Sequence, residues 1–267
     1  MKKIMIILLI GILLGGCQRE KSTIIRMETS LGTIRLKLYD ETFRHRENLL
    51  KLVRENSYNG LLFHRVIKDF MIQTGDPDSK GCRSGILLGA KDIGPTIQAE
   101  ILPQFFHKRG TLAAARESDN INPNRNSSGS QFYIVQGKTL TAKELDDAVE
   151  AINNKRYTAL FNRLKTGREG DIAKYQRAED YENLMRVNRE LSDATHHQFE
   201  QVKLKLSDEQ RKAYTTIGGT PHLDGEYTIF GEVIEGMDIV DKIAILETDE
   251  NCRPLQDVVI LKMEEEE

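Results

Sequence analysis

Tryptophan is absent from this chain of 267 residues, which has only three cysteines and six prolines. No group of Cys, His, Asp and Glu has the spacing of a metal site, and the adjacent His196 and His197 fall on a predicted helix, where their rings point apart. A basic stripe is lacking too, since 38 Lys and Arg stand against 41 Asp and Glu, for a net charge of −3. We therefore expect no metal, no cofactor and no nucleic-acid partner.

Long apolar runs are also missing. The run at residues 4–14 follows Lys2 and Lys3, and it is too short to cross a hydrocarbon core of about 30 Å at a rise of about 1.5 Å per residue. A positive start, a short apolar stretch and small residues predict a signal peptide over residues 1–16. The Leu-Gly-Gly-Cys sequence that ends at Cys17 resembles a bacterial lipobox, which implies that Cys17 is acylated and becomes the mature N-terminus. An ordinary secretory signal with an accidental cysteine is the alternative.

Lipidation of Cys17 would anchor the protein to a membrane through a short polar tether, residues 17–22. Several acyl chains on one cysteine hold a protein stably, whereas a single chain binds only marginally. Because Gln18 follows the cysteine in place of Asp, the resemblance implies sorting to the outer membrane. We expect a lipid-anchored protein of the bacterial cell envelope, with the periplasmic face favoured.

Removal of residues 1–16 takes away two lysines and no acids, so the net charge changes from −3 to −5. Cys82 and Cys252 then remain in a compartment where disulfides persist. Both lie in turn-like sequence, and a bridge requires Cα atoms within about 7 Å. The sequence leaves this pairing open.

The segment from Phe63 to Asp76, FHRVIKDFMIQTGD, is the most informative in the chain. Apolar residues alternate on both sides of a central turn, which predicts two strands of a hairpin. A period of two places Phe63, Arg65 and Ile67 on one face of the first strand, and Met71 and Gln73 on one face of the second. A cation beside an apolar pocket, with an amide to orient it, indicates a functional site.

Two later segments extend this pattern. SGSQFYIV, residues 128–135, contains a glutamine followed by aromatic residues, and residues 221–233 contain an Asp-Gly turn flanked by strand residues. In this order the three segments resemble the cyclophilin family of peptidyl-prolyl cis-trans isomerases. Its FHR…FMxQxGD, GSQFFI and LDG…FGxV patterns stand here as Phe63–Asp76, Gly129–Ile134 and Leu223–Val233. The resemblance runs from Ile24 to Lys262, interrupted by one long insertion.

The resemblance implies a mainly β fold, a closed eight-stranded antiparallel β-barrel capped by two helices. The many short predicted strands agree with a barrel. They are Thr23–Met27, Thr33–Tyr39, Leu61–Arg65, Phe70–Thr74, Thr111–Ala115, Gln131–Gln136, Tyr227–Val233 and Val258–Met263, with a further short strand expected at Ile97–Glu100.

Two helices are predicted in the barrel. Thr42 is expected to cap the first, which runs to about Glu55. The second lies near Met237–Ile243. The inner face of the first helix is predicted to carry Phe43, Leu49, Leu50 and Val53. The glutamate run at 264–267 is interpreted as a solvated tail.

The composition changes abruptly between Lys138 and Gly218, where proline is absent and charged residues and Asn are dense. Capping boxes beginning at Thr141 and at Ser207 predict helix starts. Gly167 and Gly170 are predicted to mark a turn between two long helices.

We predict an antiparallel helical arm over residues 141–216, with ends that meet at the rim of the site. The barrel then consists of residues 23–140 and 217–267. The resemblance does not cover this arm, which is expected to add little to the barrel core.

The resemblance assigns catalysis to Arg65 and the positioning of its guanidinium to Gln73. An X–Pro bond rotates slowly because amide resonance sets a barrier of about 18–20 kcal/mol. As resonance is lost the prolyl nitrogen becomes pyramidal, so a fixed guanidinium that donates to it favours the twisted state. Lysine is a poor substitute for this planar fork.

Substrate binding is assigned by the same resemblance. The pocket for the proline ring is formed by Phe70, Met71, Tyr133 and Leu223. A strand edge at Ala115 and Arg116 pairs with the substrate backbone, and Gln131 forms a hydrogen bond with the same backbone. In chain order the predicted binding residues are Phe70, Met71, Ala115, Arg116, Gln131, Tyr133, His222, Leu223 and Tyr227.

Several of these positions depart from the usual family pattern. His222 stands where many cyclophilins have the tryptophan that the resemblance associates with cyclosporin binding. Tyr227 replaces a histidine, Tyr133 a phenylalanine and Arg116 an asparagine, and the loop at 117–130 is longer than usual. These changes put drug affinity and sequence preference in doubt, but they leave the arginine in place.

The expected function is therefore isomerisation of X–Pro bonds in proline-containing polypeptides, in support of the folding of exported proteins. The alternative is a non-catalytic module or chaperone that docks proline-containing segments while the helical arm grips clients. Intact Arg65, Gln73 and Phe70 favour the enzyme. A large exposed apolar stripe on the arm would favour the binding module.

Overall fold

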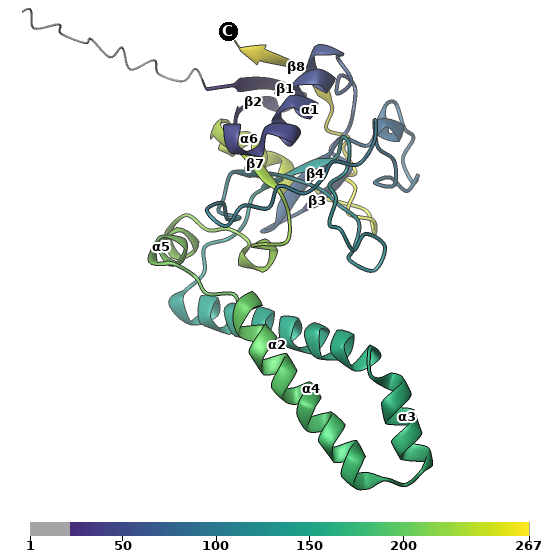
Figure 1. Ribbon diagram of the computed structural model, residues 1–267. Helices are drawn as coiled ribbons and strands as arrows, with labels where there is room; N and C mark the ends of the chain where they lie inside the picture. Colours follow the sequence, from purple (N-terminus) through teal and green to yellow (C-terminus); the bar gives the residue numbers. More distant parts are fainter. Residues whose placement is uncertain (1–21, 267) are drawn as a thin grey trace, which may run out of the picture.

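The computed structural model describes residues 22–266, so the predicted signal peptide and Cys17 lie outside the described residues. Eight antiparallel strands form one sheet, in the order β3-β4-β6-β5-β7-β2-β1-β8 (Figure 1). The strands are β1 (Ile24–Thr29), β2 (Gly32–Leu38), β3 (Arg65–Ile67), β4 (Met71–Thr74), β5 (Thr111–Ala114), β6 (Phe132–Val135), β7 (Ile229–Glu235) and β8 (Ile260–Glu266). The helices are α1 (Phe43–Arg54), α2 (Ala142–Thr166), α3 (Glu169–Arg177), α4 (Tyr181–Val202), α5 (Asp208–Thr216) and α6 (Met237–Ala244).

The sheet curls until its two edges approach each other. Within residues 22–266 no ladder joins the edge strands β3 and β8. Beside them, Leu62 and Val259 form a single antiparallel bridge, and the Phe63 amide donates to the Val258 carbonyl at 3.0 Å. The prediction of eight antiparallel strands is confirmed, whereas full closure of the barrel is not confirmed.

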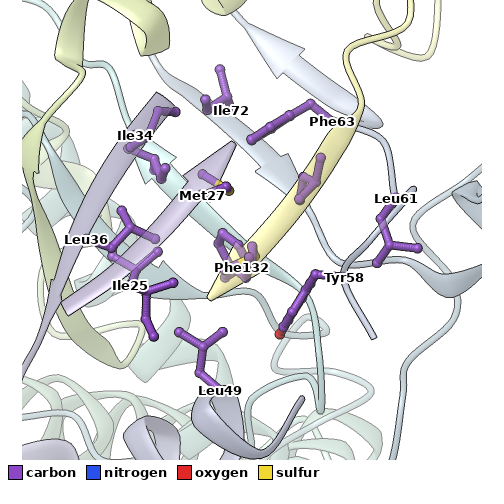
Figure 2. Close-up of a cluster of buried hydrophobic side chains, with 14 of the residues drawn as sticks. Ile25, Met27, Ile34, Leu36, Leu49, Tyr58, Leu61, Phe63, Ile72 and Phe132 are labelled. Carbon is purple, nitrogen blue, oxygen red and sulfur yellow. The ribbon is translucent and has the colours of Figure 1, made fainter. Parts of the chain in front are cut away.

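The main core lies on the inner face of this sheet. Ile25 and Met27 of β1 and Ile34 and Leu36 of β2 point into it at every second position, as the pleat of a strand requires. In Figure 2 these side chains converge above Leu49 of α1. Burying each large aliphatic side chain contributes about 1.5–3 kcal/mol, so this cluster is the main source of the barrel's stability. As predicted, α1 and α6 both pack on it, the latter through Ile239, Val240, Ile243 and Ala244.

Helix α1 corrects two predictions. Phe43 does not face the core but is 57% exposed, with the Arg46 guanidinium 5.3 Å from its ring centre. Thr42 does not cap the helix, because a short 3-10 turn precedes α1 and the Thr42 side chain makes no capping bond. The Glu100 carboxylate instead accepts from the amides of Arg44 and His45 at 3.2 and 3.1 Å, so a distant loop satisfies the start of this helix.

Strand positions shift in the segment around Arg65. β3 begins only at Arg65, and Phe63 lies before the strand in the main core, so the prediction that Phe63 shares a face with Arg65 is wrong. The expected strand at Ile97–Glu100 is a single bridge between Ile97 and Ser127. The Asp-Gly turn follows a 3-10 helix at Pro221–Leu223 rather than joining two strands.

Helices α2 to α5 occupy the insertion, and α2, α3 and α4 project away from the sheet (Figure 1). Both capping boxes form, at Thr141 for α2 and at Ser207 for α5. Gly167 ends α2 as predicted, but Gly170 lies inside α3, so a short third helix replaces the simple turn between α2 and α4. The ends of the insertion meet where Lys138 and Gly219 form a bridge.

Glu264, Glu265 and Glu266 are not a free tail. They belong to β8, where Glu264 pairs with Arg26 at 3.3 Å, Glu265 with Arg54 at 2.7 Å and Glu266 with Arg35 at 2.6 Å. Antiparallel pairing of β8 with β1 places Glu264 opposite Arg26, while Arg54 of α1 and Arg35 of β2 reach the other two carboxylates, which the sequence run alone did not reveal.

Three further features concern only the described residues. Cys82 and Cys252 are both free thiols. None of the helices in residues 22–266 is long and apolar enough to cross a membrane. Within the same range no group of three or more His, Cys, Asp or Glu is arranged to hold a metal ion.

Candidate functional site

One row of residues crosses four neighbouring strands on the outer face of the sheet. Arg65 of β3 is opposite Gln73 of β4, which is opposite Tyr133 of β6, which is opposite Ala113 of β5. Their neighbours along each strand point to the other face and fill the main core, namely Val66, Ile72, Ile134 and Leu112. The pleat therefore separates the candidate site from the core, and the arginine stands at the edge of the row.

A pocket of about 250 Å³ opens on this face. It brings together nine of the predicted site residues and adds two, Leu88 and Gly89, from the irregular segment between β4 and β5. No periodicity marked those two in the sequence. The lining residues are Arg65, Phe70, Met71, Gln73, Leu88, Gly89, Ala115, Arg116, Tyr133, Leu223 and Tyr227.

The two remaining predicted binding residues border this pocket. Gln131 lies in an adjoining cavity of about 390 Å³, which shares Gln73, Ala115 and Arg116 with the pocket. The ring of His222 lies at the opposite rim, with its centre 5.2 Å from that of Phe70.

Arg65 is exposed, yet a chain of side-chain amides holds its guanidinium. Its Nη1 donates to Oε1 of Gln73 at 3.1 Å, and Nε2 of Gln73 donates to Oε1 of Gln131 at 3.0 Å. Gln131 is fixed in turn, because its Nε2 donates to the backbone oxygens of Gly89 and Lys91 at 3.0 and 2.9 Å. A guanidinium has five N–H donors, so those not used by Gln73 remain free to meet a ligand.

The floor and walls of the pocket are apolar or aromatic. Met71, Tyr133 and Leu223 are buried, Phe70 is half-buried, and the ring of Tyr227 meets that of Tyr133 edge to face at 5.8 Å. An unbranched Met fits an irregular wall well. A small apolar ring can lose its contact with water here while its edge faces the arginine.

A series of buried, hydrogen-bonded polar side chains holds the hydroxyl of Tyr133, and the sequence did not predict it. His107 Nε2 lies 2.9 Å from the Tyr133 hydroxyl, and His107 Nδ1 lies 3.1 Å from Oδ1 of Asp224. The Tyr214 hydroxyl of α5 donates to the other oxygen of Asp224 at 2.6 Å. His107 stands in an irregular segment, and Tyr214 belongs to the insertion, so no pattern connected these residues to the pocket.

The hydrogen-bond geometry of these four buried side chains determines where their protons lie. The Asp224 carboxylate can only accept, so the Nδ1 proton of His107 points to it and the Nε2 atom is left to accept from Tyr133. Burial raises the pKa of Tyr133 well above its usual range, with smaller contributions from Tyr227 and Asp224. Burial also raises the pKa of Tyr214, and the neighbouring Asp224 adds to the effect. Both phenols therefore stay protonated and donate.

The comparisons with known proteins agree with this geometry. The family model for cyclophilin type peptidyl-prolyl cis-trans isomerase matches residues 24–177 and 206–265. The chain belongs to this family. Residues 178–205, which the family model leaves unmatched, fall in the outer part of the helical insertion of this cyclophilin. The expectation that the resemblance leaves out the whole insertion is therefore wrong for residues 141–177 and 206–216.

Curated relatives from bacteria carry matching names. A Staphylococcus haemolyticus protein, provisionally named a peptidyl-prolyl cis-trans isomerase, is 29% identical over 91% of this chain and 91% of its own length. A Streptococcus pyogenes protein, provisionally named a bifunctional phosphatase/peptidyl-prolyl cis-trans isomerase, is 28% identical over 90% of this chain. The match spans only 38% of that longer protein.

Solved structures show the same fold. A cyclophilin type isomerase from Cryptosporidium parvum superposes with a TM-score of 0.54 at 19% identity, covering 92% of this chain and 99% of its own. The same Cryptosporidium protein has also been crystallised in the presence of the dipeptide Ala-Pro, and that structure superposes with a TM-score of 0.51.

Arg116, which departs from the usual cyclophilin asparagine, is held rigidly beside the pocket. Its Nε donates to the Glu226 carbonyl at 2.8 Å, its Nη1 donates to Asp119 at 2.6 Å, and its guanidinium lies 4.7 Å from the ring centre of Tyr227. The side chain is therefore part of the wall.

Fewer backbone groups than predicted are unpaired at the strand edge formed by Ala115 and Arg116. The Ala115 amide donates to Gln131 and its carbonyl accepts from Ser128, so both backbone groups of Ala115 are already paired. Among the described residues only Arg116 of this predicted pair has a backbone N–H and C=O without a hydrogen bond. Both backbone groups of Arg116 are therefore available to an added strand, whereas the Ala115 N–H is not.

Proposed function

We propose that this cyclophilin isomerises X–Pro bonds with the proline ring in the apolar pocket and with Arg65 as the catalytic residue. The observation that carries the proposal is the chain from Arg65 through Gln73 and Gln131 to the backbone, which fixes a guanidinium at the edge of an apolar pocket. Because the chain is in place before substrate binds, little reorganisation is needed when the bond twists.

The chemistry requires no nucleophile and no proton transfer. Rotation about the X–Pro bond localises the lone pair on the prolyl nitrogen, and a guanidinium N–H that donates to this lone pair stabilises the twisted state more than either planar state. A pocket that excludes water strengthens the same interaction. The substrate backbone pairs with the free N–H and C=O of Arg116, which orients the bond over Arg65.

Replacement of Arg65 by alanine tests this mechanism directly. Arg65→Ala is expected to lower kcat/KM for a proline-containing tetrapeptide by two orders of magnitude or more, a loss of about 2.7 kcal/mol in transition-state stabilisation. Isomerisation is measured by NMR exchange, and peptide affinity by calorimetry. Affinity should fall far less than the rate, because the guanidinium acts on the twisted bond. Near-normal turnover in the variant would exclude Arg65 as the catalytic group.

We also propose that the protein is lipid-anchored at Cys17 in the bacterial cell envelope and assists the folding of exported proteins. The sequence of residues 1–17 supports this location, since it has the features typical of a signal peptide and ends in a lipobox-like sequence. Metabolic labelling with a palmitate analogue should mark the protein in the membrane fraction. Cys17→Ser should remove both the label and the sedimentation with membranes, and a labelled variant would contradict the proposal.

A further inference from the structure

A groove of about 490 Å³ runs between helix α2 of the insertion and the barrel segment that carries His222. Ala148, Ala151 and Ile152 of α2 lie on one side of it. Pro221 and His222 lie on the other. The two alanines have little bulk, so the space between the helix and the barrel stays open.

The groove continues from the proline pocket. Asp69 and His222 line the groove, and the residues that directly follow them, Phe70 and Leu223, line the pocket. The rings of Phe70 and His222 lie 5.2 Å apart at this junction. A polypeptide that leaves the pocket at its Phe70 end therefore enters the groove, while the Arg116 end leads to the separate cavity beside Gln131.

Helix α2 is anchored on both sides of the groove. Before the groove, Leu145 is fully buried in a cluster with Leu140 and Tyr214. After it, Arg156 Nη2 donates to the Asp224 carbonyl at 2.6 Å and to Glu226 at 2.9 Å. With contacts at both ends the groove is formed before any ligand binds, which lowers the entropy cost of binding.

The lining indicates what the groove can accept. Leu140, Ala148, Ala151, Ile152 and Pro221 make much of its lining apolar, and its charged lining residues are Asp69, Glu144, Asp147 and Lys138. Lys143 pairs with Asp147 at 2.7 Å, so three carboxylates stand against two ammonium groups. Apolar walls favour an apolar side chain, and the excess of negative charge favours a basic one.

We propose that this groove binds the part of a client polypeptide that continues from the X–Pro bond past Phe70, and that it prefers an apolar residue followed by Lys or Arg. The inference rests on the proposed isomerase function, because the proline anchors the segment. It makes the insertion a specificity element beside the proline pocket, which the residues lining that pocket do not supply.

The test compares a tetrapeptide containing the X–Pro bond with two longer peptides. One carries a Leu-Lys extension after the proline, and the other carries it before the X residue. For the wild-type protein, one of the two extensions should raise kcat/KM over the tetrapeptide by about fivefold, mainly through a lower KM. That extension is the one that lies in the groove.

Ala151→Trp fills the groove from an exposed position and should abolish this advantage. The advantage is measured as the ratio of kcat/KM for the favoured extended peptide to kcat/KM for the tetrapeptide. Ala159→Trp is the matched control, because Ala159 is exposed on the same helix and does not line the groove. In the wild-type protein a Leu-Lys extension should be preferred over a Leu-Glu extension. Asp147→Lys should reverse this preference, whereas Glu150→Lys, which lies outside the groove, should leave it unchanged.

Equal ratios in the Ala151→Trp and Ala159→Trp proteins, or no gain from either extension in the wild type, would overturn the groove and leave the isomerase intact. If the wild-type protein does not turn over the tetrapeptide at all, the proposed function fails and the groove inference fails with it.

Discussion

His64, the neighbour of Arg65, occupies a site that disfavours positive charge. The side chain is buried, and neither ring nitrogen has a hydrogen-bond partner among the described residues. Burial lowers the pKa of His64 to about 4; the carboxylate of Asp76 opposes the shift and Arg65 adds to it. The imidazole is therefore uncharged in the folded protein near neutral pH.

This environment predicts a loss of stability on acidification. A histidine in the unfolded chain titrates near pH 6.5, so it binds a proton below that pH. In the folded protein His64 binds a proton only near pH 4 and below. The free energy of unfolding should therefore fall as the pH drops from about 6.5 to about 4, by on the order of 3 kcal/mol from this residue. Urea unfolding of the wild type and of His64→Leu across this range measures the difference. Carboxylates elsewhere contribute equally to both proteins, so parallel pH profiles would contradict the assignment.

His222 predicts weak binding of cyclosporin. Imidazole offers a smaller apolar surface than indole, and in this cyclophilin the ring already packs on Phe70 at the rim of the pocket. His222→Trp should tighten cyclosporin binding measurably by calorimetry, with isomerisation of a tetrapeptide as a check that the pocket is intact. Tight binding by the unaltered protein would show that this position does not decide affinity.

Among single residues, the sequence predicted best those that belong to contiguous motifs. Arg65 and Gln73 face each other across one hairpin, as the alternation of its strands predicted, whereas Phe70 and Met71 of the same hairpin were assigned by the resemblance to cyclophilins. The backbone of Ala115 could not be judged in this way, because its partners Gln131 and Ser128 come from a loop whose path depends on the tertiary fold.

At the level of the elements, α5 is linked to the pocket through one buried side chain. Its Tyr214 is fully buried and donates to Asp224, which holds His107 against Tyr133. The backbone packs tightly here, since a Cβ on Gly219 would lie 2.6 Å from the Tyr214 ring and 2.3 Å from the His107 oxygen. Helix α5 was predicted from its capping box, but its contact with the site involves residues far apart in sequence.

Tyr214→Phe should separate this positioning role from simple packing. The ring is kept, but one oxygen of a buried carboxylate loses its donor, which costs about 1–3 kcal/mol of stability. We expect KM for a tetrapeptide to rise severalfold as Tyr133 loses its fixed position, with a smaller change in kcat. Tyr181→Phe, at an exposed site on α4, is the control. An unchanged KM in a destabilised Tyr214→Phe protein would limit the hydroxyl to a role in stability.

Over the whole molecule, the insertion is not the independent arm that its sequence suggested. Among the described residues none of the insertion belongs to the two core clusters of the barrel, as expected, but its inner part packs on the barrel through a separate buried cluster in which Leu145 and Tyr214 meet Leu140. Its outer part has exposed apolar residues, Tyr181 and Met185, one turn apart at the distal end, which do not make a long stripe. The composition of the segment predicted helices correctly, but it could not predict which of them pack on the barrel.

Removing only the distal part of the insertion, residues 158–201, should therefore have a different effect from removing the whole of residues 141–216. Asn153 of α2 exchanges hydrogen bonds of 3.1 and 2.8 Å with the backbone of Leu204, and Arg156 donates to the Val202 carbonyl at 3.0 Å, so the chain ends on either side of residues 158–201 are already adjacent. A short Gly-Ser loop in place of residues 158–201 should keep tetrapeptide isomerisation within a few-fold of the parent, because the inner anchors and Tyr214 remain.

Replacement of residues 141–216 by a similar loop should instead lower both activity and the free energy of unfolding, since it removes Leu145, Arg156 and Tyr214 together. NMR exchange and urea unfolding on both truncated proteins measure the contrast. If the full replacement isomerised the tetrapeptide as fast as the distal one, the inner helices would have no part in shaping the pocket, and the buried chain from Tyr214 to Tyr133 would matter only for packing.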